Sequence, residues 1–320
     1  MTVHVGVDLG GTNVKCAVVE IDAGSEPRVL ATASEPTRSQ QGPEAVLMRV
    51  ARLAEATAAP FDPPQAVGLG LPGHFDAERG TGVILPNLAG DWVGRPIAGP
   101  VAERLGLPVL LVNDARALTL AELRLGAGRG ARTMVCVTLG TGVGGGVVID
   151  GRLHLGTGEA GEIGHTIVEP DGPVCGCGNR GCLDRVAGAG AIAARAGCAT
   201  VEDAIAAARS GDLRARAALE HAARAVGIAL GGATVLLWPD RIVVGGGVAE
   251  AGELLLAPLR REIATRARVY PIDALTIASA ELGPVAGAIG AALWSHEAPD
   301  TDLRPRPLAH RGSDGAGDLL

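Results

Sequence analysis

The stretch Asp8-Leu-Gly-Gly-Thr-Asn-Val-Lys15 joins two apolar segments, residues 3–9 and 14–20, that are typical of the strands of a hairpin. A related stretch, Leu139-Gly-Thr-Gly-Val-Gly-Gly-Gly146, again lies between two apolar segments. Because glycine-rich turns between strands occur twice, near residues 10 and 142, we expect two similar lobes.

The remaining periodicity alternates between strand and helix, which indicates an α/β chain. Strands are expected at 66–71, 108–112, 135–139, 146–149 and 241–244, and helices at 44–59, 115–125, 187–197, 201–209, 213–237, 252–268 and 284–296. We assign residues 1–116 to a small N-terminal lobe, to which the helix at 284–296 returns, and residues 117–283 to a larger lobe. Residues 299–320 lack periodicity and are predicted to be disordered.

Composition excludes two classes of partner. The 320 residues carry 28 basic and 35 acidic side chains, a net charge of −7, whereas a binder of nucleic acid or of an anionic membrane surface normally carries the opposite sign. Mean hydropathy is high at +0.27, but uncharged apolar stretches such as 225–238 are shorter than the roughly 18–20 residues of a membrane span. The N-terminus shows no secretion signal, so we expect a cytoplasmic protein.

The glycine clusters predict a nucleotide-binding site. Glycine at the end of a strand lets backbone N–H groups approach an anion, and a threonine hydroxyl can add a hydrogen bond to phosphate. One cluster alone is equally typical of a tight hairpin, but a third, Val244-Gly-Gly-Gly-Val248, follows another strand. Lys15 is the only lysine, and it either contacts phosphate or reflects a codon bias toward arginine. The expected contacts are Gly10, Gly11, Thr12, Asn13, Lys15, Gly140, Thr141, Gly142, Gly144, Gly145 and Gly246.

A zinc site is indicated by His165, Cys175, Cys177 and Cys182. Three thiolates and one imidazole at this spacing are typical of a closed, tetrahedral structural site, which would hold together the loop-rich segment 156–184. Because four protein ligands leave no position for water, a hydrolytic zinc is not expected. The alternative is a set of unrelated reduced thiols.

These motifs, with Asn113-Asp114-Ala and Gly161-Glu-Ile-Gly-His165, resemble those of the ROK family of sugar kinases in content and order. The resemblance covers residues 3–296. It implies the α/β, ribonuclease H-like fold of the actin-like ATPases, with two lobes around a cleft and a zinc-bound loop. It also implies that ATP with Mg²⁺ binds the larger lobe, that sugar binds between the lobes, and, by analogy, that the chain forms a homodimer.

The same resemblance implies roles for individual residues. Asp114 would be the base that accepts the proton of the attacking sugar hydroxyl, although Asn113 or Asp114 could instead only cap the helix that follows. Asp8 would lie near Mg²⁺. His165 would bind zinc through one ring nitrogen and sugar through the other. The sugar contacts implied are Gly73, Asn87, Asn113, Asp114, Glu162, His165 and Asp184.

Asp184 departs from the family pattern, in which the residue two positions after the last zinc cysteine is glutamate. The shorter side chain withdraws the carboxylate by about 1.5 Å, one carbon–carbon bond. That change leaves room for a water or for another substituent on the sugar. Glu159, Asp91 and Asp184 could receive an ammonium group, or they could simply be surface residues.

We therefore expect an ATP-dependent kinase that phosphorylates the 6-hydroxyl of glucose or a close analogue. An aminohexose such as kanosamine, in antibiotic biosynthesis, is the alternative substrate. A sugar-responsive transcriptional regulator is less favoured, because only seven residues precede Asp8 and a DNA-binding module would be needed there.

Overall fold

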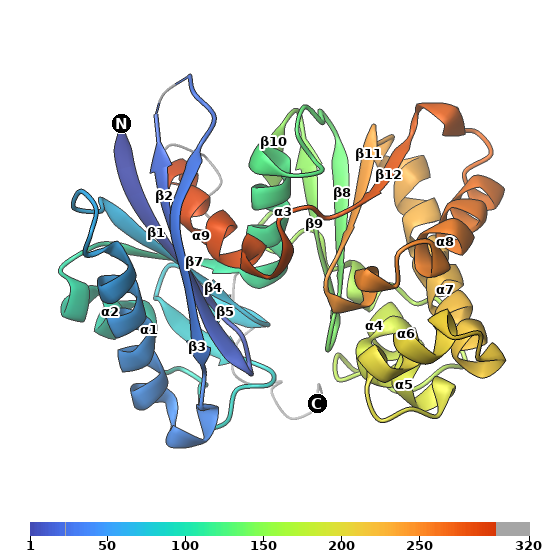
Figure 1. Ribbon diagram of the computed structural model, residues 1–320, viewed down its shortest axis with the longest axis horizontal. Helices are drawn as coiled ribbons and strands as arrows, with labels where there is room; N and C mark the ends of the chain where they lie inside the picture. Colours follow the sequence, from blue (N-terminus) through green and yellow to red (C-terminus); the bar gives the residue numbers. More distant parts are fainter. Residues whose placement is uncertain (23, 299–320) are drawn as a thin grey trace. The chain divides into compact units, whose positions relative to one another are not determined.

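A computed structural model describes residues 1–22 and 24–298, which form two units (Figure 1). Unit 1 comprises Met1–Arg129 and the described residues from Leu282 onward, and unit 2 comprises Gly130–Glu281. Unit 1 thus extends past residue 116, where the sequence predicted its boundary. The reason is that helix α3 (Asp114–Leu125) packs against α9 (Ala286–Glu297) and lies wholly in unit 1. The disorder predicted for residues 299–320 concerns a segment outside the described residues.

Unit 1 is built on a five-stranded sheet in the order β3-β2-β1-β4-β7. β1 pairs antiparallel with β2, and β2 with β3, whereas β1, β4 and β7 run parallel. Besides α3 and α9, the strands and α-helices of unit 1 are β1 (Thr2–Leu9), β2 (Asn13–Ile21), β3 (Arg28–Pro36), α1 (Pro43–Ala58), β4 (Ala66–Leu71), β5 (His74–Asp76), β6 (Thr81–Ile84), α2 (Ala98–Leu105) and β7 (Val109–Asn113).

The alternation of β1 places two different surfaces on the two sides of this sheet. Val5 and Val7 lie in the hydrophobic core with the apolar stripe of α1. On the other side, a Cβ atom at Gly6 would lie 1.9 Å from the Ala288 carbonyl oxygen of α9, and one at Gly68 in β4 would lie 1.7 Å from that of Ala291. The two glycines are therefore required because α9 packs directly on the backbone of the sheet.

His4 occupies the same side of β1 and is 3% exposed. Its Nδ1 lies 2.9 Å from the Ser295 hydroxyl of α9, and its ring meets that of His296 edge-on at 5.0 Å between centroids. Burial, assisted by the nearby His296, lowers the pKa of His4 to about 4.

Stability should consequently fall as the pH falls from about 6.5 to about 4. The unfolded chain takes up a proton on His4 near its ordinary pKa of about 6.5, whereas the native chain does not, so acid favours unfolding in this window by at most about 3 kcal/mol. Urea unfolding of His4→Asn across these pH values should show a flatter profile than that of the parent, and His154→Asn, on an exposed histidine, is the matched control. Equal slopes for the parent and His4→Asn would contradict the assignment.

Unit 2 repeats the same strand arrangement, with the order β10-β9-β8-β11-β12. β8 pairs antiparallel with β9, and β9 with β10, whereas β8, β11 and β12 run parallel. The elements are β8 (Met134–Leu139), β9 (Val143–Ile149), β10 (Arg152–His154), α4 (Leu183–Ala187), α5 (Ala189–Ala196), α6 (Val201–Arg209), α7 (Leu213–Leu237), β11 (Arg241–Gly245), α8 (Glu253–Arg266) and β12 (Thr276–Ser279).

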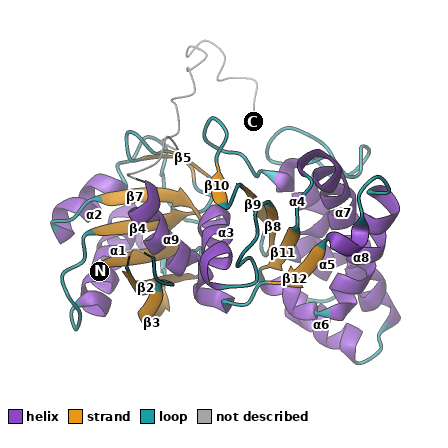
Figure 2. Cartoon of the chain, turned by 90° about the horizontal axis from the view of Figure 1, so that it is seen from above, coloured by secondary structure: helices purple, strands orange, loops and turns teal. Residues whose placement is uncertain are grey.

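The core of unit 2 lies between its sheet and helices α4–α8, which gather on one side of the strands (Figures 1 and 2). The long helix α7 begins at the Asp212 side chain, which accepts a hydrogen bond from the Ala215 N–H, and it packs against α8. The shared strand order confirms the two similar lobes expected from the recurring glycine-rich turns.

Glu122 of α3 is fully buried beside both points where the chain passes between the units. Its Oε2 accepts a hydrogen bond from the Ala127 N–H at 2.9 Å, just before the chain leaves unit 1. Its Oε1 accepts one from the Leu282 N–H at 2.9 Å, where the chain returns. One carboxylate therefore holds two backbone amides that lie far apart in the sequence.

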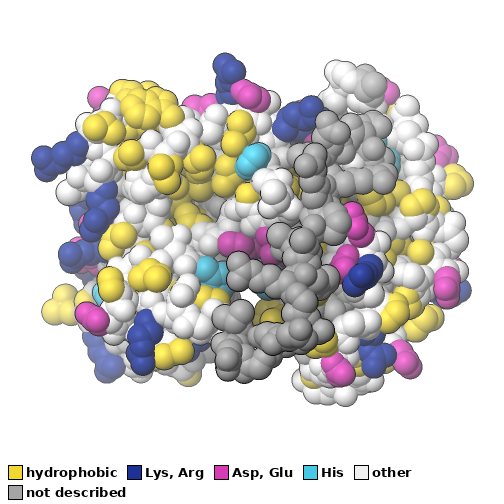
Figure 3. Space-filling model, turned by 180° about the vertical axis from the view of Figure 1, so that it is seen from behind, with side chains coloured by type: hydrophobic (Ala, Val, Ile, Leu, Met, Phe, Trp, Pro, Cys, Tyr) yellow, Lys and Arg dark blue, Asp and Glu magenta, His cyan; other side chains and the backbone are white. Residues whose placement is uncertain are grey.

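Among the described residues, no helix combines the length and apolar character that crossing a membrane would require. On the face drawn in Figure 3, Lys and Arg side chains are interspersed with acidic and apolar ones.

Candidate functional site

The first glycine-rich turn connects β1 to β2 in unit 1, as the sequence predicts. The Gly10 N–H donates to the Asn13 carbonyl at 3.1 Å and closes the turn. Asp8, near the end of β1, lies opposite Lys15 of β2, and the Asp8 carboxylate is 3.9 Å from the Lys15 ammonium. The turn thus carries one acidic and one basic side chain at its base.

The Asp8 carboxyl is enclosed by the start of α9. A Cβ atom at Gly287 would lie 2.9 Å from Asp8 Oδ2, so glycine at this position leaves the space that the carboxylate occupies. Burial raises the pKa of Asp8 above its ordinary value, and Lys15 only partly opposes that effect. A second cation would favour the charged form of this carboxylate, which suits the environment of a magnesium ion.

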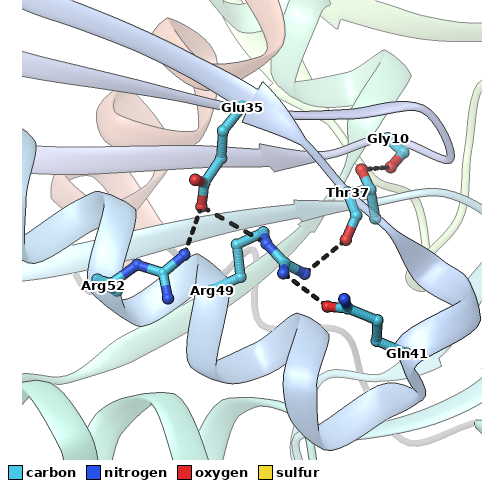
Figure 4. Close-up of polar contacts among 6 residues, drawn as sticks. All are labelled: Gly10, Glu35, Thr37, Gln41, Arg49 and Arg52. Atoms are coloured by element: carbon cyan, nitrogen blue, oxygen red, sulfur yellow. Dashed lines mark hydrogen bonds and ion pairs between the residues drawn. The ribbon is translucent and has the colours of Figure 1, made fainter.

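A network of hydrogen bonds and ion pairs connects the first glycine-rich turn to Thr37 and to Arg49 of α1 (Figure 4). Thr37 donates its hydroxyl to the Gly10 carbonyl at 2.6 Å and its N–H to the Thr12 carbonyl at 2.8 Å. Arg49 of α1, 8% exposed, donates to the Thr37 carbonyl at 2.8 Å and is 3.8 Å from Glu35. Sequence reasoning missed Thr37 and Arg49. The available signal was an arginine within the apolar stripe of α1.

Asn113 and Asp114 lie where β7 ends and α3 begins, on the same edge of the parallel strands as Asp8. Asn113 Oδ1 accepts from the N–H groups of Ala115 and Arg116, and Asp114 Oδ1 accepts from that of Ala115 at 2.8 Å. Asn113 therefore caps α3, and the Asp114 carboxylate contacts the backbone at the first turn of the same helix.

The loop residues expected beside the sugar approach the same edge. Asn113 Nδ2 donates to the Gly73 carbonyl at 3.4 Å, and Gly73 has a φ of +75°. Asn87 also adopts a left-handed conformation, with φ +66°, and its backbone carbonyl would lie 2.7 Å from a Cβ atom at Gly11. Unit 1 thus brings Gly73, Asn113 and Asp114 together, and it places Asn87 against the first turn.

In unit 2 the second turn, Gly140–Gly142, follows β8 and adjoins the third glycine cluster. Strands β8 and β11 are parallel neighbours. A Cβ atom at Gly246, where φ is +85°, would lie 2.3 Å from the Leu139 carbonyl oxygen. Gly145, by contrast, lies within β9, where a Cβ would lie 2.8 Å from Ile163 Cγ2 and 2.9 Å from the Gly161 carbonyl. Gly145 therefore makes room for segment 161–163.

The structure brings the four expected zinc ligands into one cluster. The nearest ligand atoms of His165, Cys175, Cys177 and Cys182 all lie within 4.8 Å of one another. The Cys175 Sγ–His165 Nδ1 distance is 3.7 Å and the Cys177 Sγ–Cys182 Sγ distance is 3.6 Å. A tetrahedral zinc with bonds of about 2.0–2.3 Å separates its ligands by roughly 3.3–3.8 Å, so the residues fit this ion.

The two ring nitrogens of His165 face different partners. Nδ1 lies in the cysteine cluster, and Nε2 is 3.9 Å from Glu162 Oε2. Both side chains are just over one-third exposed, at 37% and 36%. A metal bound at Nδ1 would fix the orientation of the ring and hence of Nε2.

Asp184 lies in α4, directly after the zinc cluster, and its carboxylate reaches the second glycine turn. Asp184 Oδ1 accepts a hydrogen bond from the Val143 N–H at 2.8 Å. The sequence expectation of a sugar contact did not anticipate this bond, because Val143 is 41 positions away.

Comparisons with known proteins agree with this arrangement. Residues 4–298 match the model of the ROK family. A glucokinase from Thermotoga maritima is 36% identical over 312 residues, which span 90% of this chain and 95% of the relative. The ROK hexokinase structure from Thermus thermophilus is 36% identical with a TM-score of 0.80, covering 94% of this chain and 100% of that one.

A ROK family glucokinase from Streptomyces griseus, crystallised with glucose and AMPPNP, is 33% identical with a TM-score of 0.79. The match covers 92% of this chain and 99% of that one. These similarities confirm the predicted α/β fold of the actin-like ATPases. With matches across almost its whole described length, this chain belongs to the ROK family.

Proposed function

We propose that this chain transfers the γ-phosphoryl group of ATP to the 6-hydroxyl of glucose or a close analogue. The observation that carries the proposal is the position of Asp114, at the carboxyl end of β7 on the same sheet edge as Asp8 and the first glycine turn. The similarity to glucokinases supports ATP as donor and a hexose as acceptor. The chain is thus a phosphotransferase with an alcohol acceptor.

Asp114 is the base in this reaction. Its Oδ1 is held by the Ala115 N–H, and that bond fixes the carboxylate while a carboxylate oxygen accepts the proton of the sugar hydroxyl. Asn113 positions the same region by capping α3 and by binding the Gly73 carbonyl. By the resemblance to the family, the Glu162 carboxylate would accept a hydrogen bond from a ring hydroxyl, and His165 would bind another.

The glycine turns would hold the phosphates through backbone N–H groups, with Lys15 as the one ammonium group. Asp8 would lie near Mg²⁺, which supplies charge neutralisation at the β- and γ-phosphates when bound. Zinc would have a structural role, holding segment 165–182 and the orientation of His165.

Sugar-dependent release of ADP from Mg·ATP should be measured over a panel of hexoses ranked by kcat/KM. The panel includes glucose, N-acetylated hexoses and amino sugars, and phosphorus NMR of the product should locate the phosphate on the 6-oxygen. Preference for an amino sugar would select the aminohexose alternative. Release of ADP that no hexose increases would contradict the proposal.

The cytoplasmic location and the homodimer expected from the sequence stay predictions.

A further inference from the structure

The second glycine-rich turn is enclosed by the segment that follows the last zinc ligand. Asp184 Oδ1 accepts from the Val143 N–H at 2.8 Å, and the Ala189 N–H donates to the Gly140 carbonyl at 2.8 Å. Between these two bonds the turn is closed by the Gly140 N–H, which donates to the Gly142 carbonyl at 2.9 Å. Both ends of the turn are thus bound by the chain around α4.

Gly142 shows how closely the carboxylate lies over the turn. A Cβ atom at this position would lie 2.6 Å from Asp184 Oδ1 and 3.7 Å from Asp184 Cγ. The φ angle of Gly142 is not in the left-handed region, so its backbone accepts other residues. The absence of a side chain at 142 therefore leaves room for Asp184.

We propose that Asp184 is a positioning residue for the nucleotide, which holds the second glycine turn in its phosphate-binding shape through the Val143 N–H. The inference rests on the proposed kinase function and assigns Asp184 to the ATP side of the reaction. Cys182 and Asp184 are two positions apart, so a metal at the cysteine cluster and the turn are linked through one short helix.

This assignment separates Asp184 from the sugar contacts. A carboxylate that serves the turn acts as a hydrogen-bond acceptor, a role that an asparagine Oδ1 can also fill. Its loss should therefore weaken nucleotide binding, and asparagine should restore most of that binding. A direct sugar ligand would leave the nucleotide affinity unchanged.

The first test measures binding of the non-hydrolysable analogue AMPPNP with Mg²⁺ by calorimetry, with zinc per chain determined on the same samples. We expect Asp184→Ala to raise the Kd about tenfold and Asp184→Asn to remain within threefold of the parent, with zinc content unchanged. Asp171→Ala, which removes an exposed carboxylate from the same loop, is the matched control. An Asp184→Ala variant within twofold of the parent would overturn the proposal, whatever happens to the KM for sugar.

A second variant tests the hydrogen bond between Asp184 and the Val143 N–H by changing the glycine turn instead of the carboxylate. Gly142→Ala should push Asp184 off the Val143 N–H and weaken AMPPNP binding to a similar extent as Asp184→Ala. In the double variant, which combines Gly142→Ala with Asp184→Ala, the new methyl group at position 142 has no carboxylate to displace. The Kd of the double variant for AMPPNP should therefore stay within threefold of the Kd of either single variant. Multiplicative effects would overturn the proposal, because Gly142 would then act on phosphate independently of Asp184.

These readouts also separate this proposal from the kinase function. If the parent phosphorylates a hexose while Asp184→Ala binds AMPPNP normally, only the positioning role fails. If the parent binds no AMPPNP, the proposed kinase function itself is contradicted, and the positioning role of Asp184 falls with it.

Discussion

Replacing Asp114 with asparagine should lower kcat for sugar phosphorylation by about a thousandfold, within the range of 10²–10⁴ that a positioned general base contributes. The substitution preserves the oxygen that accepts from the Ala115 N–H at 2.8 Å, so the start of α3 should remain intact. It removes the group that takes the proton. We therefore expect the KM for sugar to change less than threefold, and steady-state ADP release together with calorimetric sugar binding checks both values.

The control for this experiment is Asp62→Asn, which alters an exposed carboxyl of unit 1. It should match the parent in kcat and in thermal unfolding. An Asp114→Asn variant whose kcat stays within tenfold of the parent would show that Asp114 does not act as the base, and the capping contact would then be its main role.

Replacing Cys182 with serine should remove the metal. Cys182 is fully buried, its Sγ is 3.6 Å from that of Cys177, and a serine hydroxyl is a poor substitute for a zinc-bound thiolate. We expect zinc to fall from about one per chain to under a tenth, with a thermal midpoint lower by roughly 10 °C. Because His165 then loses its partner at Nδ1, the KM for sugar should rise about tenfold.

Cys198→Ser is the matched control, because Cys198 is a half-buried thiol of unit 2 outside the cluster. It should retain zinc and the parent midpoint. Metal analysis of the purified parent decides the prediction directly: a parent without zinc, or a Cys182→Ser variant that keeps it, would contradict the structural metal site.

Local patterns predicted much of the fold because they report local physics. The helix expected at 213–237 is α7 with the same bounds, since its alanine-rich apolar period and the Asp212 cap act within a few residues. The strand β3 was missed, because Arg28–Pro36 is an edge strand with weak alternation that depends on pairing with β2. One helix was expected at 187–197. The structure instead has α4 ending at Ala187 and α5 beginning at Ala189, with Gly188 between them.

The candidate site divides in the same way. The His165, Cys175, Cys177 and Cys182 cluster could be predicted because all four residues lie within 18 positions of sequence and their chemistry is specific. Thr37 and Asp184 could not be assigned to the glycine turns, because their bonds cross 27 and 41 positions of sequence. Such contacts depend on the tertiary arrangement of the strands that flank each turn, and local sequence patterns do not report that arrangement.

The packing of α9 on the unit 1 sheet has a consequence for synthesis on the ribosome. The helix spans Ala286–Glu297, and the bare backbone at Gly6 and Gly68 is covered only when it arrives. All of unit 2, Gly130–Glu281, is translated before it. This side of the unit 1 sheet therefore stays uncovered by α9 until unit 2 has been translated, and surface left exposed in this way favours aggregation of incomplete chains.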